Sequence, residues 1–279
     1  MRPGGAGSML AAQHMAEHFA VPEPKPLPLP AGGGDRNAIP IYKFPNAKVV
    51  HHFIPEMPIR VSAMRALGAY HNVFSIESFM DELADAAGAG PVEFRLKHLE
   101  DKRGREVIAK AAEAFGWKKG QKAPRDRGYG FAFARYKNLA AYCAIATEVE
   151  VNAETGHPRL VRAVAAVDSG QVVNPDGLTN QIEGAIVQSM SWTLYEAVTF
   201  DDVRITSTDW QTYPILRFDA VPDSIEVHII NRPGLPFLGS GETGQGPAAA
   251  SIANAIANAT GKRLRELPFT PERVKAALG

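Results

Sequence analysis

The sequence contains a single cysteine, Cys143, among its 279 residues. One thiol cannot form an internal disulfide, a cysteine-ligated iron–sulfur cluster or a multi-cysteine zinc site within this chain. The eight histidines do not supply a metal site in place of cysteines. Only His51 and His52 are adjacent, the others are scattered along the chain, and no HExxH or His-x-His grouping occurs. We therefore expect that no side chain of this sequence holds a metal directly. Any redox cofactor would need another mode of attachment.

Net charge and long apolar runs are also missing. Thirty basic and thirty acidic side chains cancel, so no overall field would draw the protein to nucleic acid or to an anionic membrane. No run approaches the length of a membrane span, and residues 1–8 lack the apolar core of a secretory signal. We expect a globular protein that binds no nucleic acid and spans no membrane. Its expected compartment is the cytoplasm, with the periplasm as the alternative if a signal lies outside this sequence, on a missing part of the protein or on a partner.

Prolines and glycines are concentrated in residues 21–34, where Pro22 to Pro30 alternate with other residues and three glycines follow. This composition predicts an extended linker or surface loop. Helical spacing of apolar residues begins further along the chain. It predicts helices over residues 76–87, 91–99 and 105–115.

A period of two appears after Gly128 and predicts β-strands. The predicted strands cover residues 141–151, 160–168 and 224–230, and weaker strand patterns occur at 42–53 and on both sides of Asp201 and Asp202. Helical patterns return at 179–190 and 248–260. We expect an α+β fold with a boundary near Gly120. Residues 1–120 form a helix-rich part and residues 121–279 a second part with strands and a C-terminal helix.

The most informative single segment is GSGETGQGP at residues 239–247, directly ahead of the predicted helix 248–260. Glycines let a backbone fold closely around a ligand, and a helix N-terminus can receive an anion. The segment allows a phosphate-bearing cofactor with Glu242 beside it as a base, whose pKa partial burial would tune. An ordinary glycine-rich turn with a solvated Glu242 is the alternative. An unrelated nucleotide site is weaker still, because no GxGxxG directly follows a predicted strand, GSGETG at 239–244 beginning well after residues 224–230, and no P-loop lysine is present.

Further motifs occur in a fixed order around Glu242. They are AMRALG at 63–68, IESF at 76–79, VDSGQVVNP at 167–175, QIEGA at 181–185, GE at 241–242, NAI at 254–256 and TGKR at 260–263. This order resembles the molybdopterin-binding subunits of the xanthine dehydrogenase and aldehyde oxidase family, nearest to the isoquinoline 1-oxidoreductase beta-subunit type. The resemblance covers roughly residues 40–270 and implies two mixed α/β molybdopterin-binding subdomains.

In that family the dithiolene of a pterin carries the molybdenum, which suits a chain with one cysteine. The resemblance implies a molybdenum–molybdopterin cofactor in its cytosine dinucleotide form, and [2Fe-2S] clusters on a small partner subunit. It implies that Glu242 lies beside molybdenum as the general base in a hydroxylation whose oxygen comes from water. Aldehydes and N-heterocycles are the expected substrates. The protein itself would supply position and electrostatics.

The resemblance also assigns roles to other residues. Gln181 would hydrogen-bond the pterin, while Arg65 and Gly241 would contact the cofactor. Leu67 would line the substrate pocket where purine-oxidising members carry an aromatic residue, which argues against xanthine as substrate. Taken without the family, Gln181 is an exposed helix residue and Arg65 an ion-pair partner at the surface.

Two departures from the family pattern shape the expected activity. Thr243 stands where many relatives have proline, and the chain is far shorter than the family's catalytic subunits. We therefore expect the C-terminal portion of such a subunit, with little activity in isolation. It would be either a split subunit whose N-terminal part lies on a further chain, or a truncated product or fragment of the whole subunit. The alternative is a non-catalytic fragment or assembly module that cannot hold the cofactor alone.

Overall fold

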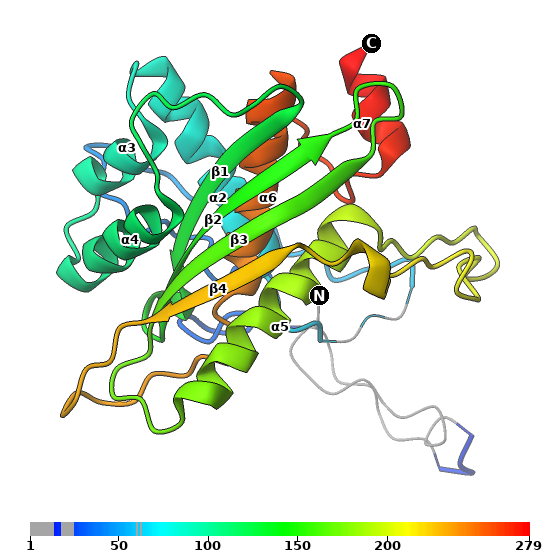
Figure 1. Ribbon diagram of the computed structural model, residues 1–279. Coiled ribbons are helices and arrows are strands. Elements are labelled where there is room, and N and C mark those ends of the chain that lie inside the picture. Colours follow the sequence, from blue (N-terminus) through cyan, green and yellow to red (C-terminus); the bar gives the residue numbers. More distant parts are fainter. Residues whose placement is uncertain (1–13, 18–24, 60, 62) are drawn as a thin grey trace.

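The computed structural model describes residues 14–17, 25–59, 61 and 63–279. Its centre is a four-stranded sheet in the order β1-β2-β3-β4, with helices packed around it (Figure 1). The strands are β1 (Arg127–Arg135), β2 (Tyr142–Val151), β3 (Pro158–Asp168) and β4 (Ser224–Ile229). The helices are α2 (Ala69–Ala86), α3 (Pro91–His98), α4 (Lys102–Phe115), α5 (Pro175–Leu194), α6 (Gln245–Thr260) and α7 (Pro271–Leu278). The predicted α+β class is confirmed.

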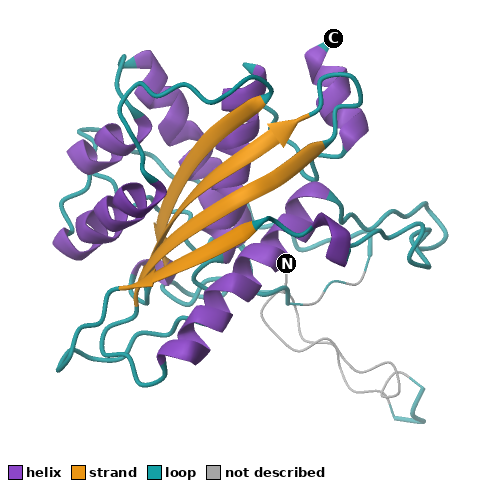
Figure 2. Cartoon of the chain, viewed as in Figure 1, coloured by secondary structure: helices purple, strands orange, loops and turns teal. Residues whose placement is uncertain are grey.

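Both faces of the sheet are buried. β1, β2 and β3 pair antiparallel, whereas β4 returns parallel to β3 after α5 and a long connection (Figure 2). Along β2, Cys143 and Ile145 belong to the core that contains α5 and α6, while Ala144 and Ala146 belong to the core that contains α3 and α4. Side chains alternate along a strand, so this register gives each face its own hydrophobic core.

Helix α6 lies directly against the backbone of β1 because β1 has glycines on that side. A Cβ at Gly130 would lie 1.9 Å from the Ser251 carbonyl oxygen, and one at Gly128 would lie 2.0 Å from the Ala255 carbonyl oxygen. Real Cβ contacts do not occur at such distances, so only glycine permits this approach. The close packing fixes the direction of α6, and with it the position of the Glu242 loop that precedes this helix.

A buried polar cluster joins α2 to α3 and β1. Glu77 Oε2 accepts from Arg95 Nε at 2.7 Å and from the Phe133 amide at 2.8 Å, and Glu77 Oε1 accepts from the Tyr42 hydroxyl at 2.7 Å. The Arg95 side chain is fully buried and also donates to Asp81 at 2.6 Å. Burying charges is tolerated here because each is paired and hydrogen-bonded. The cluster fixes α2, whose first residue follows the Arg65 loop.

The strand predictions were wrong at two places, and one strand and one helix were not predicted. Residues 42–53 form no strand: the Lys43 amide donates to the His98 carbonyl, but Val49 and Val50 are exposed and pair with no strand. Around Asp201 and Asp202 the structure has only one isolated bridge, between Phe200 and Ile205. The two unpredicted elements are β1 and α7.

Of the Pro/Gly segment 21–34, residues 25–34 are described and contain no helix or strand. The boundary placed near Gly120 falls in the connection between α4 and β1, and the division into two domains stays a prediction. Within the described residues, every helix is too short or too polar to cross a lipid bilayer.

Asn174 supplies the cap of α5, the helix that carries Gln181. Its Oδ1 accepts from the Gly177 amide at 3.0 Å, ahead of Pro175 in the first turn. We expect Asn174→Ala to lower the free energy of unfolding by about 1 kcal/mol, because one donor of the first turn then loses its acceptor. Asn174→Ser keeps a capping oxygen and should stay close to the original stability in urea unfolding. Equal losses in the two variants would contradict this role.

Candidate functional site

Glu242 lies in the loop between β4 and α6, next to buried residues. Its side chain is 33% exposed, whereas Thr243 and Gln245 are buried as the chain enters α6. The carboxylate is therefore held at the edge of the protein interior, with one side open. This placement differs from the freely solvated glutamate of an ordinary turn.

Each carboxylate oxygen of Glu242 accepts one hydrogen bond from a distant segment. Oε1 accepts from the Ala66 amide at 2.9 Å, and Oε2 accepts from the Tyr136 hydroxyl at 2.5 Å. Arg36 lies behind the tyrosine: its Nη1 is 2.5 Å from the Tyr136 oxygen and 3.8 Å from Glu242 Oε2. A carboxylate has about four acceptor positions, so two stay available for other donors.

The electrostatics of the pocket favour the charged form of Glu242. Burial raises the pKa of this carboxyl, but the hydrogen bonds from Tyr136 and Ala66 and the charges of Arg36 and Lys137 lower it by more, so the pKa lies below its ordinary value. The pKa of the Tyr136 phenol is raised, first by burial and then by its bond to Glu242. The phenol is thus a proton donor and the glutamate an ionised acceptor at neutral pH.

The loop that donates to Glu242 has an unusual backbone. Ala66 and Leu67 have φ values of 74° and 50°, in the left-handed region that non-glycine residues rarely occupy. Strained residues of this kind persist only where the surroundings hold them. Here the Gly68 amide donates to the Gly33 carbonyl at 3.1 Å, and a Cβ at Gly68 would lie 2.4 Å from the Gly34 carbonyl oxygen. The glycines after the proline-rich segment therefore pack against the loop and support it.

Arg65 links this loop to the Glu242 loop and to α5. Its Nε donates to the Gly241 carbonyl at 2.7 Å, and its Nη2 donates to Gln181 Oε1 at 2.9 Å. Its Nη1 donates to Gln188 Oε1 at 3.2 Å, about two helical turns further along α5. The planar guanidinium can bridge several acceptors at fixed angles, which a lysine cannot do. Three segments that are far apart in the sequence are thus held together at one point.

The structure brings all five residues that the sequence pointed to into one region. Gly241 and Glu242 are adjacent, Arg65 contacts Gly241 and Gln181, and Leu67 is half-buried in the same loop as Arg65. Gln181 is exposed on α5, with its oxygen held by Arg65. The roles assigned to these residues toward a cofactor or a substrate stay predictions.

Sequence reasoning missed Arg36 and Tyr136, the two residues behind Glu242. Arg36 follows the glycines of a segment expected to be a linker, and Tyr136 opens a short 3-10 turn, Tyr136–Asn138, after β1. Neither position belongs to a motif. A basic residue after three glycines and an aromatic residue at a strand end were the only local signals.

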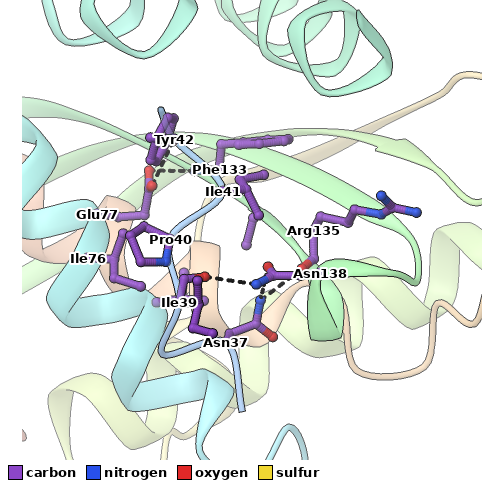
Figure 3. Close-up of a pocket in the computed structure, with 12 residues that line it drawn as sticks. Asn37, Ile39, Pro40, Ile41, Tyr42, Ile76, Glu77, Phe133, Arg135 and Asn138 are labelled. Carbon is purple, nitrogen blue, oxygen red and sulfur yellow. Dashed lines mark hydrogen bonds between the residues drawn. The ribbon is translucent and has the colours of Figure 1, made fainter. Parts of the chain in front are cut away.

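A small pocket beside this turn shows how it is held (Figure 3). The side-chain nitrogen Nδ2 of Asn37 donates to the Arg135 carbonyl at 2.8 Å and to Asn138 Oδ1 at 3.1 Å. The side-chain oxygen of Asn37 accepts from the backbone amide of Lys137 at 2.7 Å. The cavity volume is about 20 Å³, enough for one water molecule but not for a substrate. We interpret the pocket as part of the support for Tyr136.

The described residues contain no group of three or more His, Cys, Asp or Glu side chains able to hold a metal ion. The polar groups that meet around Arg65, beside the Glu242 loop, are instead side-chain amides, a backbone carbonyl and the guanidinium itself. Such groups hydrogen-bond organic rings and phosphates. The site therefore suits an organic cofactor better than a bare ion.

Comparison with known sequences agrees with this chemistry. A profile of the molybdopterin cofactor-binding domain matches residues 72–222, and a second profile with the same description matches residues 30–99. The chain is 42% identical to a nicotinate dehydrogenase subunit of Pseudomonas putida, over 88% of this chain and 22% of that protein. It is 34% identical to the beta subunit of isoquinoline 1-oxidoreductase of Brevundimonas diminuta, over 78% of this chain and 28% of that protein. The chain thus spans only about a quarter of the length of these relatives.

Solved structures share the fold. The aldehyde oxidoreductase of Desulfovibrio desulfuricans superposes with a TM-score of 0.67 at 18% identity, over 78% of this chain and 41% of that chain. Quinoline 2-oxidoreductase of Pseudomonas putida superposes with a TM-score of 0.65 at 15% identity, over 77% of this chain and 53% of that chain. The first profile alone covers more than half of this sequence, and the motif order and the fold agree with it. The chain therefore belongs to the molybdopterin cofactor-binding domains of the xanthine dehydrogenase family.

Proposed function

We propose that this chain is the C-terminal part of the catalytic subunit of a molybdenum hydroxylase, which oxidises an aldehyde or an N-heterocycle with oxygen from water. The observation that carries the proposal is the Glu242 carboxylate. It is ionised, anchored through both oxygens and open on one side, next to the contacts that join Arg65, Gln181 and Gly241. An ionised carboxylate with free acceptor positions can act as a general base.

The residues present fit a pterin cofactor in their donor chemistry. Gln181 Oε1 is taken by Arg65, whereas its NH₂ group donates to no acceptor within the part of the chain that the structure describes. An exposed amide donor of this kind matches an acceptor on a pterin edge. Gln181, Arg65 and Gly241 would hold the cofactor, which supplies the two-electron acceptor when bound.

Glu242 would act on the water that provides the new oxygen atom. In the overall reaction a carbon–hydrogen bond of the substrate becomes a carbon–hydroxyl bond, and two electrons and two protons leave. Glu242 accepts one of these protons through an acceptor position on its open side. Leu67, next to the Ala66 amide that binds Glu242, would contact the substrate as an aliphatic wall.

The names of relatives support the substrate class. Nicotinate dehydrogenase, isoquinoline 1-oxidoreductase and nicotine 6-hydroxylase are named for nitrogen heterocycles, and the first two are among those with the higher identity. An aldehyde dehydrogenase from Gluconacetobacter polyoxogenes, 26% identical, keeps aldehydes as the second class. A flat, electron-poor ring beside Leu67 is the substrate that we favour.

The proposed assembly contains more than this chain. Several relatives are named as subunits, which supports a complex of several chains. The other parts that we propose are a small subunit with [2Fe-2S] clusters and a chain or segment that supplies the rest of the molybdenum subunit. We propose the cytosine dinucleotide form of the cofactor and a cytoplasmic location, with the periplasm as the alternative that cell fractionation would detect.

Metal analysis of the complete assembly tests the proposal. Protein co-purified from molybdate-replete cells is expected to contain molybdenum and a pterin dinucleotide in near-equal amounts. Gln181→Ala should lower the content of both several-fold, because it removes a contact to the cofactor, while Gln211→Ala, which changes an exposed glutamine elsewhere, should not. If the purified complex contained neither molybdenum nor pterin, the result would contradict the proposal and favour a non-catalytic module.

A further inference from the structure

The hydrogen bonds behind Glu242 have only one consistent direction. Arginine has donors and no acceptor, so Arg36 Nη1 must donate to the Tyr136 oxygen, 2.5 Å away. The phenol has a single proton, which is then left to point at Glu242 Oε2, also 2.5 Å away. Arg36 thus determines which way the Tyr136 hydroxyl is turned. A hydroxyl turned this way stabilises the carboxylate form of Glu242.

The two residues behind Glu242 are themselves fixed. Arg36 is 6% exposed, and its Nε and Nη2 donate to the carbonyls of Ala31 and Gly32 at 2.5 and 3.2 Å. Tyr136 is also 6% exposed, and the turn that carries it is held by Asn37. Groups whose own positions are locked by packing and further hydrogen bonds can hold a functional side chain in a productive geometry.

We propose that Tyr136, oriented by Arg36, is a positioning residue that holds the Glu242 carboxylate in its charged form and turns its free acceptor positions toward the open side of the site. The inference rests on the proposed function of Glu242 as the general base. It adds to that function a reason why the base stays ionised while it is partly buried.

Several charged groups face Glu242 from the elements around it. Arg36 approaches from the segment before α2, Lys137 from the turn after β1, and Arg65 from the loop before α2. All three are positive and would remain after removal of the Tyr136 hydroxyl. Loss of that hydroxyl therefore removes one favourable contact without removing the positive surroundings, and the Glu242 pKa should rise but stay in the acidic range.

Tyr136→Phe in the complete assembly tests the inference. We expect the acid limb of the pH profile of kcat/KM to move up by about one pH unit, so that the rate below that limb falls about tenfold while the rate above pH 8 changes little. Arg36→Met should move the limb in the same direction, because it removes a positive charge 3.8 Å from Glu242 Oε2 and lets the phenol rotate. A limb that stays in place in both variants would overturn the inference.

Tyr142→Phe is the matched control. Tyr142 is another buried tyrosine, and its hydroxyl bonds a different carboxylate, Asp101 Oδ2, at 2.8 Å. Its loss should leave the acid limb unchanged. A shift in Tyr142→Phe as large as that in Tyr136→Phe would show a general effect of weakened packing and would contradict a specific role of Tyr136.

A readout without turnover separates this inference from the proposed function. In the 279-residue chain labelled with ¹³C at the glutamate carboxyls, the Glu242 signal is the one lost in Glu242→Gln, and its titration midpoint should be higher in Tyr136→Phe. A shifted midpoint together with full turnover in Glu242→Gln would keep the positioning role and reject the catalytic one. An unshifted midpoint together with lost turnover in Glu242→Gln would do the reverse.

Discussion

Glu242→Gln is expected to lower turnover of the complete assembly by about 10²–10⁴-fold while leaving its molybdenum and pterin content unchanged. The amide has nearly the same shape as the carboxyl group and can still accept from the Ala66 amide, but it cannot take a proton from water. The residues that we propose hold the cofactor are Gln181, Arg65 and Gly241, whose mutual contacts do not involve the Glu242 side chain, so the substitution should not release the cofactor. Steady-state kinetics and metal analysis of the same preparation measure both quantities.

The exposed Glu154, in the turn between β2 and β3, gives a control for the same chemical change. Glu154→Gln should keep turnover and cofactor content. Turnover of Glu242→Gln within a few-fold of the original would remove Glu242 from the role of base. Loss of molybdenum in Glu242→Gln alone would mean that this side chain helps to retain the cofactor.

Gly130→Ala is expected to lower the stability of the protein strongly. The new Cβ would lie 1.9 Å from the Ser251 carbonyl oxygen and 2.4 Å from the Ala255 amide nitrogen, both in the backbone of α6. Neither atom can rotate away, so α6 must move off the sheet or β1 must bend. We expect the free energy of unfolding to fall by about 3 kcal/mol, at the upper end for overpacked cores. The midpoint of thermal unfolding should fall by roughly 6–12 °C.

Gly184→Ala is the matched control, because Gly184 lies in α5 and a Cβ there meets nothing within 4 Å. Alanine is favoured over glycine in a helix, so this variant should be slightly more stable, by up to about 1 kcal/mol. If the Gly130→Ala variant were as stable as the Gly184→Ala variant, α6 would not pack on β1 as described. Since α6 starts three residues after Glu242, we also expect Gly130→Ala to displace the carboxylate.

Much of the secondary structure followed from local sequence patterns. The strands β2 and β3 and the helix α6 have long, regular apolar patterns, and their predicted ranges agree closely with the structure. β1 was missed because the glycines that admit α6 interrupt its pattern. Residues 42–53 have strand-like composition but no partner strand, and an extended segment without a partner gains no ladder of hydrogen bonds. Composition could not distinguish these two cases.

The candidate site, too, follows partly from local sequence and partly from contacts in the tertiary structure. The sequence by itself determined that this chain belongs with molybdopterin-binding proteins, since motif order and glycine placement are local properties of the chain. It also pointed to Glu242, Arg65 and Gln181. Only the tertiary structure decided how Glu242 is held, because Arg36 is 100 residues from Tyr136, and Tyr136 is 106 residues from Glu242. Contacts over such separations depend on how the strands and helices pack, and no local pattern in the sequence encodes them.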